Sequence, residues 1–291
     1  MNDSVELRAP SAPVVERIDP DGEALPLVFD SPHSGTEYPN DFRPAAPMHL
    51  VRMSVDDFVD ELFAEAPAHG AVLIAARFPR VYVDPNRHEA DIDLALLSEA
   101  WPGPVKPSGK QKFGKSLIWR HLGADMPIYD RDLSVAEIEH RIAHYWRPYH
   151  DCVQQALDDA YARAGGVWHV NCHSMASRAG SGHPDAGQER ADFTVSDRCG
   201  KSASTDFLDC VVETLCGLGY RVAVNDPYQG MELISRYCDP ASGRHSLQIE
   251  IKRSLYLSEG RRQRHDGFEA LRQDLGRFCA SLAAFVRSAA G

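Results

Sequence analysis

The sequence predicts one α/β domain built around a mostly parallel or mixed β-sheet. Short apolar segments with strand patterning alternate along the chain with segments whose apolar residues recur at helical spacing. No internal repeat and no linker rich in proline and serine divides the sequence. Two of the strand-like segments run directly into polar loops that contain histidine, and the ligands of open α/β sheets gather at the carboxyl ends of strands.

In the first half of the chain, the sequence pattern predicts a leader, three extended segments and one helix. Residues 1–24, rich in Pro, Asp and Glu, are expected to form a flexible leader, which leaves 25–291 as a single domain. The extended segments are expected at 25–30, 71–76 and 80–87, the last broken by Pro85. Ser54 can cap a helix whose apolar residues follow helical spacing up to Phe63. Residues 99–115, rich in Gly, Pro and Lys, are expected to form the longest loop.

The second half predicts three helices and four strands. Ser134 and Glu137 form a capping box for a long amphipathic helix that reaches about residue 164, with a kink expected at Pro148. The other two helices are expected at 205–216 and 268–285, where apolar residues recur at helical spacing. The strands are expected at 167–172, 193–197, 221–225 and 245–251.

Composition and charge exclude several classes of protein. An apolar fraction of 43% and a charged fraction of 25% are ordinary for a globular chain and exclude a mostly disordered or fibrous one. The net charge of −11 disfavours nucleic acid or an anionic membrane surface as the main partner. There is no apolar run of membrane-spanning length, no signal-peptide pattern and no CxxC pair among the seven cysteines. A cytoplasmic protein with buried thiols is expected, and the oligomeric state is left open.

His33 and His173 are candidate metal ligands, because each directly follows a predicted strand. Either one alone could be an ordinary loop residue, but the two together favour a metal site. A catalytic zinc takes three protein ligands and leaves one position open. Asp56, expected in the first turn of the helix after His33, is a suitable third ligand. The helix dipole alone would also explain Asp56 and its neighbour Asp57.

Two further groups of residues could bind or transform a substrate. Residues 77–87 contain three arginines and Asn86, which could bind a carboxylate or could form a surface cluster of ion pairs with the nearby acids; their spacing does not decide between the two. Glu250 shares a strand face with Gln248 and opposes apolar neighbours. It is either a solvent-exposed carboxylate on an edge strand or a placed acid–base group.

Five ordered motifs, PHSGTEYP, DDFVDELF, FPRVYVDPNR, CHSM and LQIEIKRSLYL, resemble those of the N-formylglutamate amidohydrolase family over residues 27–258. That family is similar in fold to zinc carboxypeptidases and to the aspartoacylase and succinylglutamate desuccinylase group. The resemblance therefore implies a three-layer α/β/α, zinc-exopeptidase-like domain with a mixed central sheet and one Zn²⁺ ion.

The resemblance also implies roles for individual residues. The implied zinc ligands are His33, Asp56 and His173, and Glu250 matches the glutamate that activates water. Asn86 and Arg87 resemble a pair that holds the substrate carboxylate. In matching segments, Arg80 is assigned to catalysis and Arg244 and His245 to substrate binding.

The implied activity is the hydrolysis of N-formyl-L-glutamate, a small anionic N-acyl amino acid, to formate and L-glutamate. A hydrolase of another N-acyl amino acid and a non-catalytic ligand-binding relative are the alternatives. Two departures from the family pattern bear on this choice. Asn171 stands where relatives usually carry aspartate, and residues 226–232 lack the expected Gly-Gly form.

Overall fold

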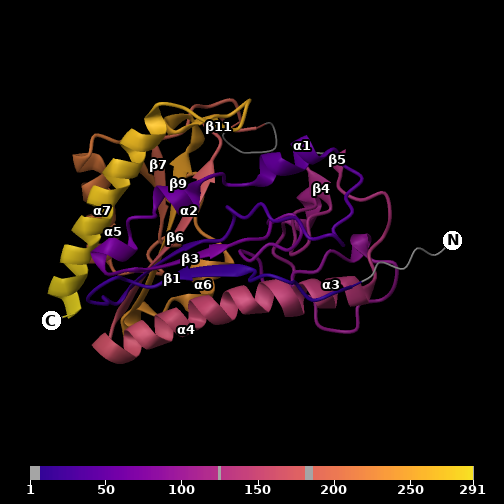
Figure 1. The fold of residues 1–291 in the computed structure, drawn as a ribbon, viewed down its shortest axis with the longest axis horizontal. Helices are drawn as coiled ribbons and strands as arrows, with labels where there is room; N and C mark the ends of the chain where they lie inside the picture. Colours follow the sequence, from indigo (N-terminus) through magenta and orange to yellow (C-terminus); the bar gives the residue numbers. More distant parts are fainter. Residues whose placement is uncertain (1–6, 124–125, 181–185, 291) are drawn as a thin grey trace.

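The computed structural model describes residues 7–123, 126–180 and 186–290 and contains a seven-stranded sheet (Figure 1). Its strands, in the order in which they lie in the sheet, are β1 (Val15–Ile18), β3 (Val72–Ala76), β2 (Leu27–Ser31), β6 (Val167–Met175), β9 (Arg244–Lys252), β7 (Phe193–Ser196) and β8 (Val222–Val224). The β1–β3 and β7–β9 pairs are antiparallel and the other pairs are parallel. The predicted mixed sheet is thus confirmed.

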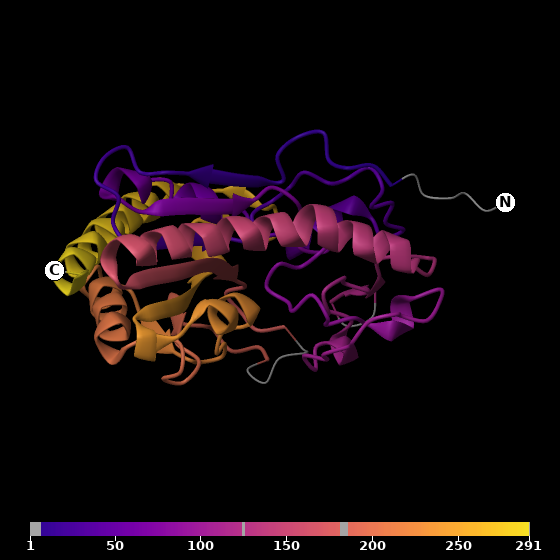
Figure 2. The same cartoon turned by 90° about the horizontal axis from the view of Figure 1, so that it is seen from below.

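Helices cover both faces of this sheet, which makes three layers (Figures 1 and 2). The helices are α1 (Met48–Val51), α2 (Val59–Leu62), α3 (Val135–Arg141), α4 (Arg147–Ala164), α5 (Thr205–Gly217), α6 (Glu232–Tyr237) and α7 (Gly267–Ala290). On one face α4 packs against β1, β2, β3 and β6, whereas α2, α5 and α7 cover the other face. The remaining strands form two small antiparallel sheets, β4 (His121–Leu122) with β5 (Met126–Pro127) and β10 (Leu257–Ser258) with β11 (Gln263–Arg264).

The long central helix follows the predicted pattern with one irregularity. The side chain of Ser134 accepts from the backbone N–H of Glu137, and the Glu137 carboxylate accepts from the backbone N–H of Ser134, so the capping box is present. A π-helical segment, Ile142–Trp146, then separates α3 from α4. It ends two residues before Pro148, which has no N–H to continue the regular hydrogen-bond pattern.

Three local predictions were wrong. Residues 15–18, expected in a flexible leader, form the edge strand β1, because their backbone pairs with β3; residues 1–6 of that leader lie outside the described residues. The helix expected from Ser54 begins only at Val59, since the Ser54 hydroxyl donates back to Val51 and Phe58 adopts a left-handed φ of 63°. Residues 80–87 form turns instead of an extended segment, and the Asp84 carboxylate accepts from the backbone N–H of Asn86 at 2.9 Å.

The two faces of the central strands differ in polarity. On β6 and β9 the residues Val170, Cys172, Leu247, Ile249 and Ile251 belong to the apolar core under α2, α5 and α7. The alternate residues point to the opposite face of the sheet and are polar and buried: His169, Asn171, His173, Ser246, Gln248 and Glu250. A buried polar stripe therefore runs along the middle of the sheet toward the carboxyl ends of β6 and β9.

No helix in the described part of the chain is long and apolar enough to cross a membrane.

Candidate metal and active site

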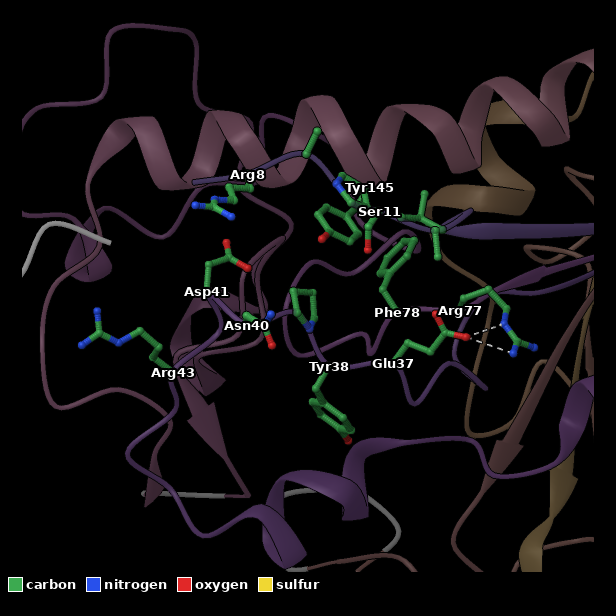
Figure 3. A pocket seen from close by; sticks show the side chains of 15 residues that line it. Arg8, Ser11, Glu37, Tyr38, Asn40, Asp41, Arg43, Arg77, Phe78 and Tyr145 are labelled. Carbon is green, nitrogen blue, oxygen red and sulfur yellow. Dashed lines mark hydrogen bonds and ion pairs between the residues drawn. The ribbon is translucent and has the colours of Figure 1, made fainter. Parts of the chain in front are cut away.

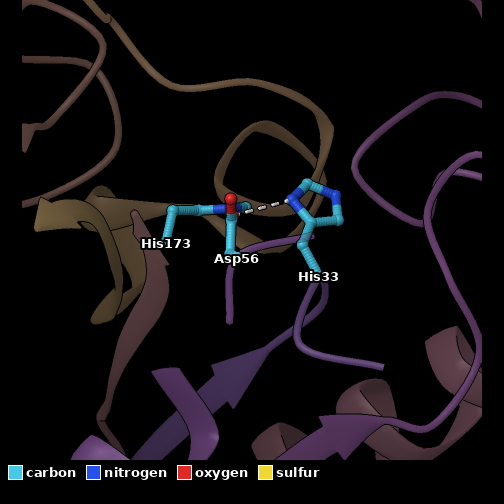
Figure 4. Close-up of side chains that lie close together, drawn as sticks. All are labelled: His33, Asp56 and His173. Carbon is cyan, nitrogen blue, oxygen red and sulfur yellow. Dashed lines mark hydrogen bonds and ion pairs between the residues drawn. The ribbon is translucent and has the colours of Figure 1, made fainter. Parts of the chain in front are cut away.

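His33, Asp56 and His173 come together in a buried cluster (Figure 4). His33 follows β2, Asp56 lies in the loop before α2, and His173 lies near the end of β6. The Oδ2 atom of Asp56 lies 3.4 Å from His33 Nδ1 and 3.2 Å from His173 Nδ1. All three side chains are at most 3% exposed. Three residues predicted as ligands from separate parts of the sequence thus present one ligand atom each to a common point.

The geometry of the cluster fits a tetrahedral metal site. Two ligand atoms bound to one zinc at about 2.0–2.1 Å lie about 3.3 Å apart, close to the two distances measured from Asp56. The Nδ1 atom of His33 is buried and has no hydrogen-bond partner in the described residues. A buried nitrogen of this kind is costly unless something binds its lone pair, and a divalent cation would do so.

Asp84 orients His33 by contacting the ring nitrogen that does not face Asp56. Its Oδ1 atom lies 2.7 Å from His33 Nε2, and its Oδ2 atom accepts from Arg80 at 2.8 Å and from Trp119 at 3.1 Å. Burial alone would raise the pKa of Asp84, but the positive charge of Arg80 and the contact with His33 hold it well below the usual range. A proton on Nε2 satisfies this carboxylate and leaves Nδ1 free to bind a metal.

An amide orients His173 instead of a carboxylate. The Oδ1 atom of Asn171 lies 2.6 Å from His173 Nε2, and the Nδ2 group of Asn171 donates to Asp30 at 2.8 Å. Asp30 also contacts His169 at 2.8 Å and accepts from Tyr149 at 2.5 Å. Burial raises the pKa of Asp30, but these hydrogen bonds outweigh it and lower the pKa. The ionised carboxylate of Asp30 is therefore linked to His173 through one intermediate side chain, that of Asn171.

Asp56 is fixed by its backbone and by an arginine, not by a helix. Its backbone N–H donates to the carbonyl of His33 at 3.0 Å, and its Oδ1 atom accepts from Arg253 at 2.7 Å. Burial would raise the pKa of Asp56, but its contacts with His173 and His33 and the positive charge of Arg253 hold it well below its usual range. The prediction that Asp56 lies in the first turn of a helix was wrong, because that helix starts three residues later.

Glu250 lies beside His173 through the strand register. His173 of β6 pairs with Glu250 of β9, and neighbouring strands lie about 4.8 Å apart. Since β9 lies between β6 and β7, the interpretation of Glu250 as an edge-strand residue was wrong. Its pKa is raised to about 7, chiefly by burial, with His173 lowering it and the carboxylate of Asp56 raising it. A carboxyl group with this pKa beside a metal cluster can both take up and release a proton near neutral pH.

Three predicted site residues next to the cluster, Arg80, Asn86 and Arg87, differ in how many of their polar groups already have protein partners. Arg80 holds Asp84 with Nε and Nη2, in agreement with the ion-pair interpretation, but the pair is largely buried. The Nδ2 group of Asn86 lies 3.3 Å from His173 Nε2, and its Oδ1 atom accepts from the backbone N–H of Leu233. Arg87 is 6% exposed and donates only to backbone carbonyls, from Nε to Lys115 and from Nη1 to Asn86.

Arg244 and His245 lie at the opposite end of the sheet from the cluster. They start β9, whereas Glu250 is near its end, and five to six residues of strand span about 20 Å. Arg244 forms an ion pair with Asp158 at 2.8 Å, and His245 Nδ1 accepts from the backbone N–H of Ser204. The prediction that they bind the substrate was wrong for this site, since parallel pairing directs the start of β9 away from the carboxyl ends.

Two cavities differ in their relation to the cluster. The larger, of about 620 Å³, lies between residues 8–14 and 37–43 and is lined by none of the predicted site residues (Figure 3). Within it Glu37 and Arg77 pair with each other. The smaller, of about 220 Å³, is lined by Asn86 and Arg87 and therefore adjoins the cluster.

The sequence assigned no role to Asp30 or Arg253, and it indicated Asp84 only as one acid of the alternative ion-pair cluster. Asp84 and Arg253 lie within quoted motifs and Asp30 lies just before one, but the partner of each is more than 50 residues away in the chain. An acid near the end of a buried apolar strand, such as Asp30, is the one local feature that could have indicated a buried network.

Comparisons with known proteins agree with this geometry. The profile of the N-formylglutamate amidohydrolase family matches residues 25–257. The chain is 26% identical over 243 residues to an N-formylglutamate deformylase of Pseudomonas putida, covering 81% of this chain and 83% of that one. The crystal structure of an N-formylglutamate amidohydrolase from Ralstonia eutropha JMP134 matches with a TM-score of 0.91 and 46% identity, over 94% of this chain and 99% of that one. A gene product of Agrobacterium tumefaciens shares the fold, with a TM-score of 0.65 and 18% identity over 94% and 96% of the two chains. The chain therefore belongs to the N-formylglutamate amidohydrolase family, as its motifs predicted.

Proposed function

We propose that this protein is a zinc-dependent amidohydrolase that converts N-formyl-L-glutamate and water to formate and L-glutamate. One observation carries the proposal: a chain of this family places a buried His33–Asp56–His173 cluster beside Glu250, whose pKa is raised to about 7. We further propose that residues 25–291 act as a single catalytic domain.

The three ligands would hold the metal, and this chain's other residues would move the proton and bind the substrate. When bound, a zinc ion at this site supplies Lewis acidity, which lowers the pKa of a water molecule and polarises a carbonyl. Glu250 accepts a proton from the attacking water and delivers it to the amine nitrogen as the C–N bond breaks. Because its raised pKa lies near 7, the same carboxyl group can serve both steps.

Arginines next to the cluster would bind the negative charges of the substrate. Arg80 uses Nε and Nη2 to hold Asp84, which leaves Nη1 for the oxygen that becomes negative during the attack. Arg87 makes no ion pair with a carboxylate of the described residues, so its remaining N–H groups can receive the α-carboxylate, with Asn86 next to it. The net charge of −11 does not oppose an anionic substrate, because charges farther away than about 8–10 Å are largely screened.

Metal analysis followed by a formate-release assay tests the proposal. The purified protein is expected to contain about one zinc per chain and to release formate from N-formyl-L-glutamate. N-acetyl and N-succinyl amino acids serve as competing substrates. Faster hydrolysis of one of these would identify a different N-acyl amino acid hydrolase. Binding without turnover of any of them would identify a non-catalytic relative.

A further inference from the structure

The cavity of about 220 Å³ beside the cluster is rich in positive charge. Asn86 and Arg87 line one side, and Lys106, Arg198 and residues 230–232 line others. Its one carboxylate, that of Glu232, is paired with Arg236 at 3.4 Å. A cationic cavity in a chain with a net charge of −11 indicates a local requirement for positive charge.

The cations of this cavity form no ion pairs with the described part of the protein. No carboxylate of residues 7–123, 126–180 or 186–290 lies within ion-pair distance of Arg87, Lys106 or Arg198. Arg87 is 6% exposed, and the carboxylates of Asp84 and Asp91 act on its charge only from beyond ion-pair distance. A buried cation is costly, and an anionic ligand in the cavity would lower that cost.

A constrained turn holds Arg198 at the cavity. Arg198, Cys199 and Asn225 each adopt a left-handed φ of 56°, which is uncommon outside glycine. The Asn225 side chain fixes the turn: its Oδ1 atom accepts from the backbone N–H groups of Asp197 and Cys199, and its Nδ2 group donates to Asp197 at 2.7 Å. Strained backbone of this kind is concentrated at functional sites.

Gly230 lies beside the Arg198 side chain in the cavity wall. A Cβ atom at Gly230, whose φ is 85°, would lie 3.5 Å from Cγ of Arg198 and would collide with Ile234. Gly230 belongs to the segment that joins β8 to α6, so the backbone of this segment forms part of the cavity wall.

The side chain of Asn86 lies between the cavity and the metal-ligand cluster. Asn86 lines the cavity and its Nδ2 group also lies 3.3 Å from His173. Its Oδ1 atom accepts from the first turn of α6, which forms another part of the wall. A ligand in the cavity would therefore lie on the far side of Asn86 from the metal cluster.

We propose that this cavity binds the side chain of the substrate amino acid and that Arg198 binds its terminal carboxylate, which makes the enzyme selective for acidic N-acyl amino acids. This inference rests on the proposed function and adds a residue that determines specificity. The α-carboxylate and the side-chain carboxylate are then bound by two different arginines, Arg87 and Arg198. An uncharged side chain of the same shape would leave Arg198 unpaired.

The test compares N-formyl-L-glutamate with N-formyl-L-glutamine, which has nearly the same shape but a neutral side chain. Arg198→Gln is expected to lower kcat/KM for the glutamate substrate about 10- to 100-fold, mostly through KM, because a charged hydrogen bond is lost. It should change kcat/KM for the glutamine substrate less than about threefold. Arg198→Lys, which keeps the charge, should recover part of the loss.

Lys201→Met is the matched control. Lys201 is exposed three residues along the same turn and does not line the cavity, so removing its charge should alter neither substrate. Equal losses on both substrates in Arg198→Gln, or no loss on either, would overturn the proposal.

A binding measurement separates this inference from the proposed function. Calorimetric titration of the purified protein with L-glutamate and with L-glutamine reports on the cavity without turnover. Selective glutamate binding that disappears in Arg198→Gln supports the cavity assignment even if no formate is released, a result that would refute only the proposed reaction. Formate release by a wild type that does not distinguish the two amino acids would refute only the role of Arg198.

Discussion

Asn171 contacts His173 with an amide oxygen 2.6 Å from Nε2, while His33 on the other side of the cluster contacts a carboxylate, Asp84, at 2.7 Å. The two histidines are thus oriented by groups of different charge. The amide of Asn171 in turn donates to Asp30, so that the carboxylate near His173 acts through one intermediate residue. An aspartate at position 171 would place a second carboxylate next to the ionised Asp30.

Asn171→Asp is therefore expected to destabilise this protein. The new carboxylate would lie next to Asp30 and would remove the donor that Asp30 now has, and two adjacent carboxylates cannot both remain ionised. We expect the free energy of unfolding to fall by about 1–3 kcal/mol, measured by urea denaturation. Adding Asp30→Asn should recover part of the loss. Strict additivity of the two substitutions would contradict the proposed coupling.

Removal of either histidine ligand should lower the metal content. His33→Ala and His173→Ala each leave two protein ligands, which is fewer than a catalytic zinc site uses. We expect metal analysis to find much less than one zinc per chain, with an unchanged far-ultraviolet circular dichroism spectrum. His49→Ala, an exposed histidine away from the cluster, serves as the control. Full metal occupancy in both ligand variants would refute the assignment.

Glu250→Gln should separate metal binding from turnover. Glutamine keeps the size of the side chain but cannot accept the proton of the attacking water, so kcat should fall about 10²–10⁴-fold. The zinc content and KM should change little, because Glu250 is not proposed as a ligand. Glu213→Gln, on the exposed face of α5, is the control. Normal kcat with the metal retained would exclude a catalytic role, and loss of the metal would identify Glu250 as a ligand.

The pH dependence should reflect the raised pKa of Glu250. Because the reaction needs the ionised carboxylate and burial raises its pKa to about 7, kcat/KM should fall about tenfold per unit below pH 7. The residual activity of Glu250→Gln should lack this decline. A wild-type profile that is flat from pH 5 to 8 would argue against the assignment.

The same pKa predicts an effect on stability with a defined sign. The native state holds this proton more tightly than the unfolded chain, so the contribution of Glu250 to stability is lost as the pH rises from about 4.5 to about 7. In metal-free protein, Glu250→Gln should therefore raise Tm at pH 8 and leave it nearly unchanged at pH 4.5. A larger gain at the lower pH would contradict the direction of the shift.

Arg87→Lys should weaken binding of the substrate α-carboxylate. An ammonium group cannot reproduce the planar fork of a guanidinium, and losing a charged hydrogen bond costs about 1.5–3 kcal/mol, or about 10- to 150-fold in kcat/KM. A substrate whose α-carboxylate is capped as an amide should bind the wild type less well and lose little more in the variant. Equal losses on both substrates would indicate that Arg87 acts through the backbone carbonyls it contacts.

The α/β class, the positions of most strands and helices, and the three candidate metal ligands could be predicted from the sequence alone. Alternating or helical spacing of apolar residues records which face of each element is buried, and this is local information. The capping box at Ser134 and the strand that ends before His33 could be read for the same reason. The ordered motifs then identified the family.

How distant residues meet depends on the tertiary structure and could not be predicted from the sequence. Strand register places Glu250 beside His173. Arg244 and His245 lie at the other end of the same strand, up to about 20 Å from Glu250. A left-handed residue at Phe58 put Asp56 in a loop, and the hydrogen bond of Asp30 to His169 joins residues 139 positions apart. Such contacts depend on which strands become neighbours in the sheet and in which direction they run. The spacing of apolar residues within one segment carries no information about that choice, because it is made by packing between segments.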